Sequence, residues 1–441
     1  MLVPVVMGRK SLFFITVFLF VLLMEGSDRA VVVDSVTRQP LPSASVFDKN
    51  GNVAGITDSK GRLPYLHPES FPLSLRYLGF KEKSVTSADI DTIFMVETST
   101  ELPEVSVESG KIQLLHLVAY VREYSTLSTY SDTVFMFREK MIDFMLPPDK
   151  KMRFKGWSNP RIIKSKSYYR FTDADGLDSV SRQCNYHFSW SDWVGVVPSP
   201  ALPSRLRYIE TGADTLRGKY SAKEIWHRKD DRIAVDINVL ADTASRKWVS
   251  SLDPFFRKDM DFENFRLRYI YENVVGDSIY PVDLKSYSFN IESNGRGRGM
   301  FRFNRNDAPF YVSTFAEVHI LDKEYLSVKE AKKWSSNDYA SGRVLFERSD
   351  KAAGLQEPIL KLIARVEAID SVGERLRTAP DYMLRGKGSH KQNAGERVLS
   401  LLKQATGITY LKSHKNFDRK WQQFREERKR KNVGMESQNN N

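Results

Sequence analysis

The sequence predicts a mainly β protein with additional α-helices, and three observations predict it. Residues 31–97 alternate short runs of Val, Ile, Phe and Tyr with turn signals such as Asn50-Gly51, which is typical of a small antiparallel β-sandwich. Between residues 165 and 321 apolar and polar residues alternate at period two, as in Arg266–Tyr271. After residue 326 the apolar spacing becomes helical. We therefore expect an N-terminal β-sandwich, a larger antiparallel β-rich domain and C-terminal helices.

The turns of the N-terminal region follow from their residue types. Asn50-Gly51 supplies the positive φ that a tight hairpin requires. Asp58 precedes Lys60-Gly61 and its side chain can bind the backbone of a second turn. For Thr57-Asp58 we favour a turn clamp over a metal or catalytic pair. An inward face at period two is expected to hold Ala44, Val46, Leu63, Leu73, Leu75 and Tyr77.

Many residues of this stretch match a known pattern in order. They are Val33, Asp34, Thr37, Pro40, Leu41, Pro42, Ala44, Ser45, Val46, Gly51, Gly55, Thr57, Asp58, Gly61 and Tyr77-Leu78-Gly79-Phe80. They resemble the carboxypeptidase regulatory-like domain, a transthyretin-like β-sandwich that is not itself a peptidase. The stretch departs from that family in lacking a Gly before the first Val run and in carrying Pro64. Glu101–Val107 resembles the segment that follows this module in TonB-dependent outer-membrane receptors. The resemblance implies a transthyretin-like sandwich over residues 31–109.

The N-terminus reads as an export signal. Arg9 and Lys10 precede the apolar run Ser11–Met24, and a polar stretch then leads to the small residue Ala30. We predict a signal peptide over residues 1–30. Cys184 is the single cysteine, so the chain has no intramolecular disulfide and no cysteine near the signal to carry a lipid. An exported protein without disulfides fits the periplasm or the inner face of an outer membrane.

Residues 110–149 are expected to form a helical connector. Ile112, Leu115, Val118 and Ala119 fall on one helical face, and Pro147-Pro148 would end a second helix. Residues 150–325 are expected to form the β-rich domain. Its candidate strands are Tyr168–Thr172, Asn185–Trp190, Arg205–Glu210, Ile233–Leu240, Phe265–Tyr271, Tyr287–Ile291, Gly299–Phe303 and Tyr311–Ile320. Their alternation predicts a large antiparallel sheet with one solvated face.

Residues 326–432 are expected to be helical, and residues 433–441 a disordered tail. Ser327 and Glu330 form a capping box for a short helix, and Pro358 begins a longer one that extends to Thr378. Further helices are expected over Ala394–Ala405 and residues 416–431. The last is strongly basic, and a solvated tail helix competes with an anionic membrane contact there. The candidate contacts are Lys412, Lys415, Arg419, Lys420, Trp421, Phe424, Arg425, Arg428, Lys429 and Arg430.

No linear motif predicts a catalytic, cofactor or metal site. The seven histidines lack the spacing of a helical zinc site, and Cys184 and His187 would point to opposite faces of a strand. Asp173–Asp178 is interpreted as a hairpin turn rather than an incomplete calcium loop. The glycine-rich run Gly295–Gly299 lacks the Lys-Ser/Thr of a phosphate-binding loop and is interpreted as a basic turn.

Three functions remain open. The leading hypothesis is a non-enzymatic binding or scaffold protein of the cell envelope that uses its β domains for protein or glycan contacts, without nucleic acid. The alternative is a periplasmic carrier of a lipid or other apolar ligand. A large dry cavity lined by Phe265, Tyr269, Phe289 and Phe301 would favour that alternative. The third is a hydrolase of unfamiliar type, which would need a cleft with a clustered acid, base or nucleophile.

Overall fold

The N-terminal domain is a sandwich of two small sheets. The computed structural model describes residues 29–372, except for 88–89, 99–112, 129–132, 149–151, 174–175, 183–188, 197–199, 220, 253–259, 296–309, 347 and 349–351. The elements of this domain are β1 (Val31–Asp34), β2 (Ser45–Phe47), β3 (Val53–Ile56), η1 (Pro68–Ser70), β4 (Leu73–Arg76), β5 (Lys83–Val85) and β6 (Thr92–Met95). One sheet has the order β3-β2-β4-β5, and the other pairs β1 with β6. All six residues predicted to face inward are buried between the sheets.

The predicted turn chemistry of this domain is confirmed, whereas one strand pairing differs. Gly51 has a φ of 77° in the turn between β2 and β3. The Asp58 carboxylate accepts hydrogen bonds from the backbone N–H groups of Lys60 and Arg62. Thr57 donates its hydroxyl to a backbone carbonyl at 2.6 Å, as a turn clamp does. β1 and β6 run parallel, whereas the sequence predicts an antiparallel sandwich. Turn signals indicate which strands are neighbours along the chain but not which strands pair across the domain.

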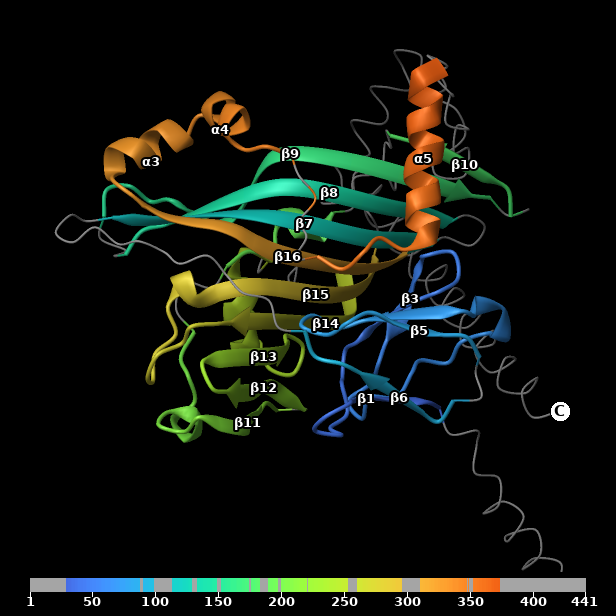
Figure 1. The fold of residues 1–441 in the computed structure, drawn as a ribbon, viewed down its shortest axis with the longest axis horizontal. Coiled ribbons are helices and arrows are strands. Elements are labelled where there is room, and N and C mark those ends of the chain that lie inside the picture. Colours follow the sequence, from blue (N-terminus) through green and yellow to red (C-terminus); the bar gives the residue numbers. More distant parts are fainter. Residues whose placement is uncertain are drawn as a thin grey trace, which may run out of the picture.

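In the described residues, a ten-stranded antiparallel sheet forms the body of the protein (Figure 1). Its first strands are β7 (Leu114–Ser128), β8 (Thr133–Leu146), β9 (Trp157–Thr172) and β10 (Asp178–Ser181). The chain then crosses to the far edge and returns through β11 (Thr211–Arg217), β12 (Ala222–Lys229), β13 (Arg232–Asn238), β14 (Met260–Tyr271), β15 (Leu284–Gly295) and β16 (Phe310–Leu326). β16 pairs with β7, which joins the two halves into one sheet.

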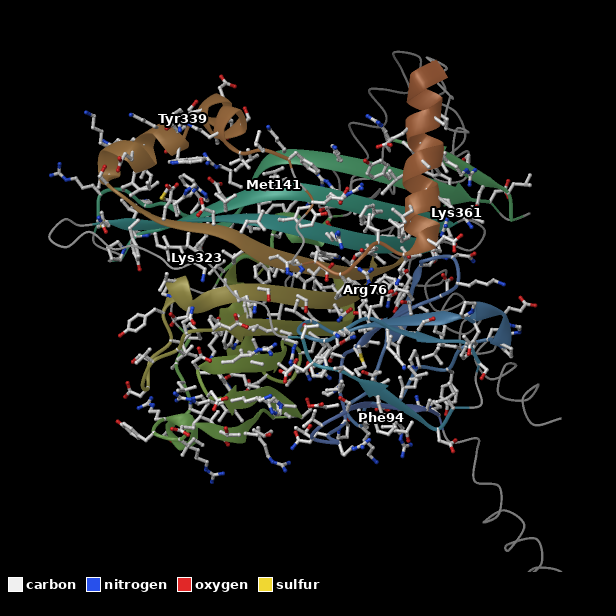
Figure 2. All side chains as sticks on the ribbon, in the orientation of Figure 1. Arg76, Phe94, Met141, Lys323, Tyr339 and Lys361 are labelled. Atoms are coloured by element: carbon white, nitrogen blue, oxygen red, sulfur yellow. The ribbon has the colours of Figure 1, made fainter. Side chains whose placement is uncertain are left out.

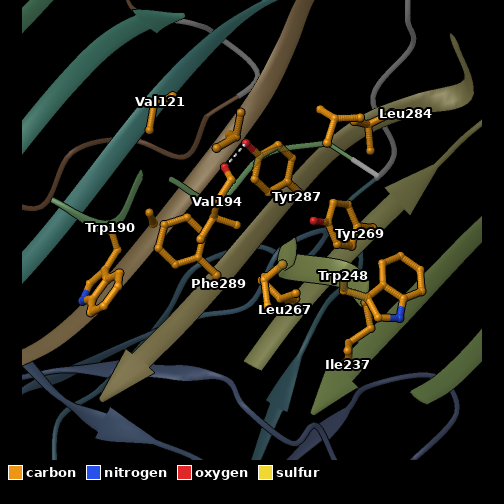
Figure 3. Packing of buried hydrophobic residues seen from close by; sticks show 14 of the residues in the cluster. Val121, Trp190, Val194, Ile237, Trp248, Leu267, Tyr269, Leu284, Tyr287 and Phe289 are labelled. Atoms are coloured by element: carbon orange, nitrogen blue, oxygen red, sulfur yellow. Dashed lines mark hydrogen bonds between the residues drawn. The ribbon is translucent and has the colours of Figure 1, made fainter. Parts of the chain in front are cut away.

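The crossing segment fills the inner face of the sheet. We call residues 189–196 and 200–206 the strap; it contains the turns η2 (Trp190–Asp192) and η3 (Ser204–Leu206). Tyr287 donates its hydroxyl to the Val194 carbonyl at 2.9 Å (Figure 3), and Tyr269 donates to the Gly195 carbonyl at 3.0 Å. The turns η4 (Thr243–Leu252) and η5 (Pro281–Asp283) complete this side. The strap and the inward side chains of the strands together make the main hydrophobic core.

The outer face of the sheet is covered by the N-terminal domain and by three helices. They are α3 (Val328–Trp334), α4 (Asn337–Arg343) and α5 (Glu357–Val372). α3 and α4 lie over one end of the long strands, and α5 stands at the other end (Figure 1). Residues Ile359, Leu362, Ile363 and Val366 of α5 pack on aromatic side chains of this face. The mainly β architecture with C-terminal helices is therefore confirmed.

The helical connector predicted over residues 110–149 is wrong. Residues 114–128 and 133–146 are β7 and β8, two central strands of the large sheet. Nearly every side chain on both strands is buried, because the strap covers one face and the N-terminal domain and helices cover the other. A strand buried on both faces loses its alternation and can match helical spacing by chance. The β-rich sheet therefore starts at Leu114, and the polar face of its central strands is covered, whereas the outer strands β9 and β11 keep exposed side chains.

Other expectations for the chain have mixed outcomes. The capping box is confirmed, because the Ser327 hydroxyl and the Glu330 carboxylate bind each other's backbone N–H groups. The helix from Pro358 is confirmed as far as Val372. The strand predicted over Arg205–Glu210 is wrong: Pro203 leads into η3, and Tyr208 has a φ of 61°, which a strand does not allow. No helix among the described residues is long and apolar enough to cross a membrane.

Candidate functional site

The candidate surface contacts predicted at residues 412–430 lie outside the described residues. So do Cys184, His187, Phe301, residues 1–28 of the predicted signal peptide and the predicted tail. Gly295 is the described member of the glycine-rich run and ends β15. The hairpin interpretation of Asp173–Asp178 is supported by its described residues, because Asp173 and Leu177 exchange hydrogen bonds between β9 and β10. Gly295, Asp173 and Leu177, which the structure does describe, do not line the site below.

A cleft of about 360 Å³ opens between the N-terminal domain and the outer face of the large sheet. Residues 76–82 and Thr98 form one wall, and Phe315, Glu317 and His319 of β16 form the floor. The segment 352–354, between α4 and α5, forms the third side. Arg76 lies where the N-terminal domain meets the sheet (Figure 2). The volume falls in the range of small-molecule sites.

The strand period places the floor residues together. Successive side chains of β16 alternate between faces, so Phe315, Glu317 and His319 share the outer face while Ala316 and Val318 enter the core. The antiparallel register sets Glu317 opposite Arg122 of β7. β16 is also held by β15 on its other side. The floor is therefore positioned by the rigid centre of the sheet.

Arg76 of β4 fixes the wall of the cleft. Its guanidinium donates to the Tyr124 hydroxyl at 2.7 Å, to the Gly354 carbonyl at 2.9 Å and to the Glu82 carboxylate at 3.0 Å. Three parts of the chain thus meet on one side chain. Burial, opposed by the nearby Arg76 charge, raises the pKa of Tyr124 to about 12, so this hydroxyl stays protonated at neutral pH. The wall is rigid because hydrogen bonds to a charged group are among the stronger ones in proteins.

The turn over the sheet is also tightly fitted. Gly79 has a φ of 87°, and a Cβ there would lie 2.5 Å from Arg232 Nη2 and 2.9 Å from Ile270 Cδ1. Glycine is therefore required both for the backbone conformation and for the close approach to the sheet. Phe80 follows it and is half-buried on the wall of the cleft, near Phe315 on the floor. Phe80 gives the cleft apolar surface, whereas Phe315 is only 2% exposed.

Glu317 and His319 are buried at the floor without complete hydrogen bonding. Their exposed fractions are 5% and 7%, yet Glu317 Oε1 and His319 Nε2 have no hydrogen-bond partner among the described residues. Glu317 forms ion pairs with Arg76 at 3.6 Å and Arg122 at 3.8 Å, and the His319 ring lies 3.7 Å from it. Burial alone would raise the pKa of Glu317, but His319, Arg76 and Arg122 outweigh it and lower the pKa to about 2. The carboxylate is therefore a permanent acceptor facing the cleft.

A second polar cluster is closed. Lys140 of β8 donates to Ser189 at 2.6 Å and Ser191 at 2.5 Å, and it pairs with Asp192 and Glu123. A lysine beside serines suits nucleophilic catalysis. Here Glu123 and both serines are almost completely buried, and Glu123 also accepts the Trp190 N–H at 2.7 Å. This cluster fastens the strap to the sheet.

A third cluster lies beneath α3. His116 faces Glu324 at 2.7 Å through Nδ1 and Asp143 at 3.0 Å through Nε2, and Asp143 also pairs with Arg161. Burial lowers the pKa of His116, but hydrogen bonds to the two carboxylates raise it more, so the net shift is upward. The ring of Trp334 covers the imidazole at a centroid distance of 4.3 Å. In the described part of the chain, no three His, Cys, Asp or Glu side chains form a metal site.

The residues named for a lipid cavity lie elsewhere. Phe265, Tyr269 and Phe289 are buried on the inner face, in the same core as the strap (Figure 3). Close packing with the strap thus replaces a large dry cavity along these described side chains. The sequence did not indicate the cleft, because Lys81 and Glu317 are far apart along the chain and no motif connects them. The sequence signal for the cleft is the alternation of polar residues on β16, which by itself predicts a solvated face of the sheet.

No protein-family model matches the chain, and no curated protein matches it in sequence. Among solved structures, the chain is similar to one titled "Lipid-protein interactions in lipovitellin", with 9% identity and a TM-score of 0.23. The similarity covers 50% of this chain and 26% of that chain, so the chain spans about a quarter of the length of that protein. A likeness of this size carries no argument about fold or function.

Proposed function

We propose that the protein is a non-enzymatic binding protein of the cell envelope, and that the cleft between its N-terminal domain and its large sheet binds a glycan. The observation that carries the proposal is the pair Glu317 and His319: Glu317 Oε1, although ion-paired with Arg76 and Arg122, and His319 Nε2 are buried at the cleft without a hydrogen-bond partner among the described residues. An unsatisfied buried polar group costs about 1–3 kcal/mol. A ligand that satisfies both atoms recovers that cost on binding.

The chemistry of the lining favours sugar hydroxyls. Glu317 is an acceptor, His319 has one ring nitrogen available, and Lys81 and Thr98 add donors on the wall. A hydroxyl both donates and accepts, so one sugar ring can meet all of these groups. The half-buried ring of Phe80 offers apolar surface for the C–H face of the same ring. A cleft of about 360 Å³ holds one or two such rings rather than a protein surface.

The geometry supports binding rather than acid catalysis. A general acid must be protonated near the working pH, and the pKa of Glu317 is lowered to about 2. The serines beside Lys140 are enclosed in the core, and that cluster is occupied in holding the strap. Export to the periplasm or the inner face of the outer membrane stays part of the proposal, as does a membrane contact through the basic C-terminal residues.

Saturation-transfer NMR on the full-length protein tests the proposal. The probes are neutral hexoses, N-acetylhexosamines and hexuronates, and those that bind are then titrated by calorimetry. We expect at least one class to bind, and Glu317→Gln or His319→Asn to weaken it tenfold or more, because a hydrogen bond to a charged group contributes about 1.5–3 kcal/mol. Glu139→Gln is the matched control, since Glu139 is buried on the same face outside the cleft and pairs with Arg348.

Two results contradict the glycan proposal. One is that no sugar of the panel receives saturation from the wild-type protein. The other is that a sugar binds the wild type and both floor variants with the same affinity, which places the binding elsewhere on the molecule. Circular dichroism of each variant separates loss of binding from loss of folding. His319→Asn is the decisive variant if Glu317→Gln fails to fold, because it leaves the Arg76 and Arg122 ion pairs in place.

A further inference from the structure

A second cavity lies under the other flank of the N-terminal domain, and it differs in charge from the cleft. Its volume is about 70 Å³, and its lining comes from the loops around Ser43 and Ser59 of the N-terminal domain and from β12, β13 and β14. The sheet contributes Ser221, Asn238 and Arg266 among its polar groups. None of these residues belongs to the glycan cleft, so the two sites can be tested separately.

Arg266 is the unusual group of this cavity. The register of the sheet sets Arg268 opposite Asp236, and these two side chains form an ion pair. The same register sets Arg266 opposite Asn238 on one side and Asn290 on the other, which carry no charge. Arg266 has no ion pair or hydrogen bond within the described residues, and its Nε is completely buried. Burial lowers the pKa of Arg266, and Asp236 offsets this only in part.

Other arginines of the described chain do not share this condition. Arg138 and Arg232 also have a buried Nε without a hydrogen bond. Each of them reaches a carboxylate through another guanidinium nitrogen, Arg138 to Asp192 at 3.5 Å and Arg232 to Glu97 at 2.7 Å. An unpaired charge taken out of water is strongly unfavourable, so buried charges in proteins are normally paired. Arg266 is half-buried with its Nε out of contact with water, and it has no counter-ion within the described residues.

The rest of the cavity can supply the other contacts of such a counter-ion. Asn238 Nδ2 donates to Ser221 Oγ at 2.9 Å, which leaves the Ser221 hydroxyl proton free for a ligand, since its contact with the Ala222 carbonyl is 3.5 Å long. Ser43 and Ser59 bring two more hydroxyl groups. One water needs roughly 10–15 Å³ of such volume, so the cavity holds about five water-sized groups, close to the heavy-atom count of a phosphate.

The carboxylate on the wall does not oppose an anion. Asp236 accepts a hydrogen bond from Tyr77 at 3.0 Å and pairs with Arg268, so its charge is neutralised within the interface. With Arg266 added, the local balance is one positive charge in excess. The apolar side chains of Ile225 and Leu267 line the same space and weaken the screening of that charge by water. We infer that this cavity is a binding site for a small oxyanion group, phosphoryl or carboxylate, held by Arg266 and the surrounding serine hydroxyls.

The test uses the full-length protein and three probes: inorganic phosphate, sulfate and acetate, at constant ionic strength set with sodium chloride. We expect at least one probe to raise the melting temperature in a saturable way, because a ligand that binds the folded state stabilises it by mass action. Phosphate and sulfate acting without acetate indicate a phosphoryl source, whereas acetate acting alone indicates a carboxylate source. Calorimetry then gives the affinity of the active probe.

Variants separate the site from a general charge effect. Arg266→Gln is expected to abolish the shift while melting in chloride at the wild-type temperature or above, because it removes an unpaired charge. Arg217→Gln, on the exposed edge strand β11, removes the same charge and is expected to keep the full shift. Ser221→Ala is expected to weaken binding several-fold, and it decides the matter if Arg266→Gln does not fold. The inference is overturned if no probe exceeds chloride, or if Arg266→Gln or Ser221→Ala binds like wild type.

Discussion

Replacing Lys140 with Met tests whether the closed polar cluster fastens the strap. The change removes the cation from a site where Glu123 has no exposure to solvent and Asp192 is nearly covered. Burial lowers the pKa of Lys140 more than Glu123 and Asp192 raise it, so desolvation outweighs attraction and the cluster is costly to build. Once built, it is more costly to break, because Met removes the cation that pairs with both carboxylates, and within the described residues only Asp192 keeps a second ion pair, with Arg138 at 3.5 Å. We expect a loss of about 3–5 kcal/mol in the free energy of unfolding.

The assay combines urea unfolding at pH 7 with hydrogen exchange of the strap. The Trp190 and Ser191 amides donate to Glu123, so their protection reports the cluster directly. Lys60→Met, at an exposed turn, is the control and is expected to change stability by less than about 0.5 kcal/mol. The double variant with Glu123→Gln should recover part of the loss, since it removes one stranded charge. Wild-type stability with intact strap protection in Lys140→Met would refute this reasoning.

Two further predictions concern pH and backbone geometry. The pKa of His116 lies above 6.5 in the folded protein, so its ion pairs stabilise fully below pH 6.5 and the stabilisation is lost as pH rises through the raised pKa. The urea midpoint of the wild type should therefore decrease as pH rises above 6.5, and His116→Asn should decrease less over the same range. An equal decrease in the variant contradicts the prediction. Gly79→Ala should lower the free energy of unfolding by more than about 1 kcal/mol. The loss should exceed that of Gly276→Ala, since Gly276 has a similar φ but no neighbour within 4 Å. Equal losses of stability in thermal unfolding would show that crowding at Gly79 contributes nothing.

The parts of the fold that local chemistry determines could be predicted from the sequence. The turn at Asn50-Gly51, the Asp58 clamp and the capping box at Ser327 each depend on residues within a few positions of one another. The same holds for α5, whose apolar side chains repeat at helical spacing. In all of these the interacting groups are neighbours in the chain, so the residue types are sufficient.

The rest depends on partners that are distant in sequence. The sequence predicts helices at β7 and β8 because both faces of these strands carry apolar side chains. The strap covers one face, and the N-terminal domain and helices cover the other. The cleft needs β4, β16 and the segment before α5 to meet, and Arg76 joins them through Tyr124 and Gly354. His319 has no motif neighbour in the sequence, because its partners in the cleft are distant along the chain. A linear pattern does not contain the register that sets Glu317 beside the N-terminal domain.

Unsatisfied polar groups in the interface between the N-terminal domain and the sheet indicate where ligands can bind. Arg268, Tyr77 and Asn290 are all satisfied within it, which is how a contact built for rigidity disposes of its polar groups. Glu317 and Arg266 depart from that rule at opposite flanks: Glu317 Oε1 is ion-paired but has no hydrogen-bond partner among the described residues, and Arg266 has no ion pair there. An unsatisfied buried polar group lowers the stability of the folded protein, and Arg268, Tyr77 and Asn290 in the same interface do not carry that cost. Since each also lines a cavity, we propose that a ligand supplies the missing hydrogen bond or counter-ion, and that the two flanks bind ligands of different chemistry.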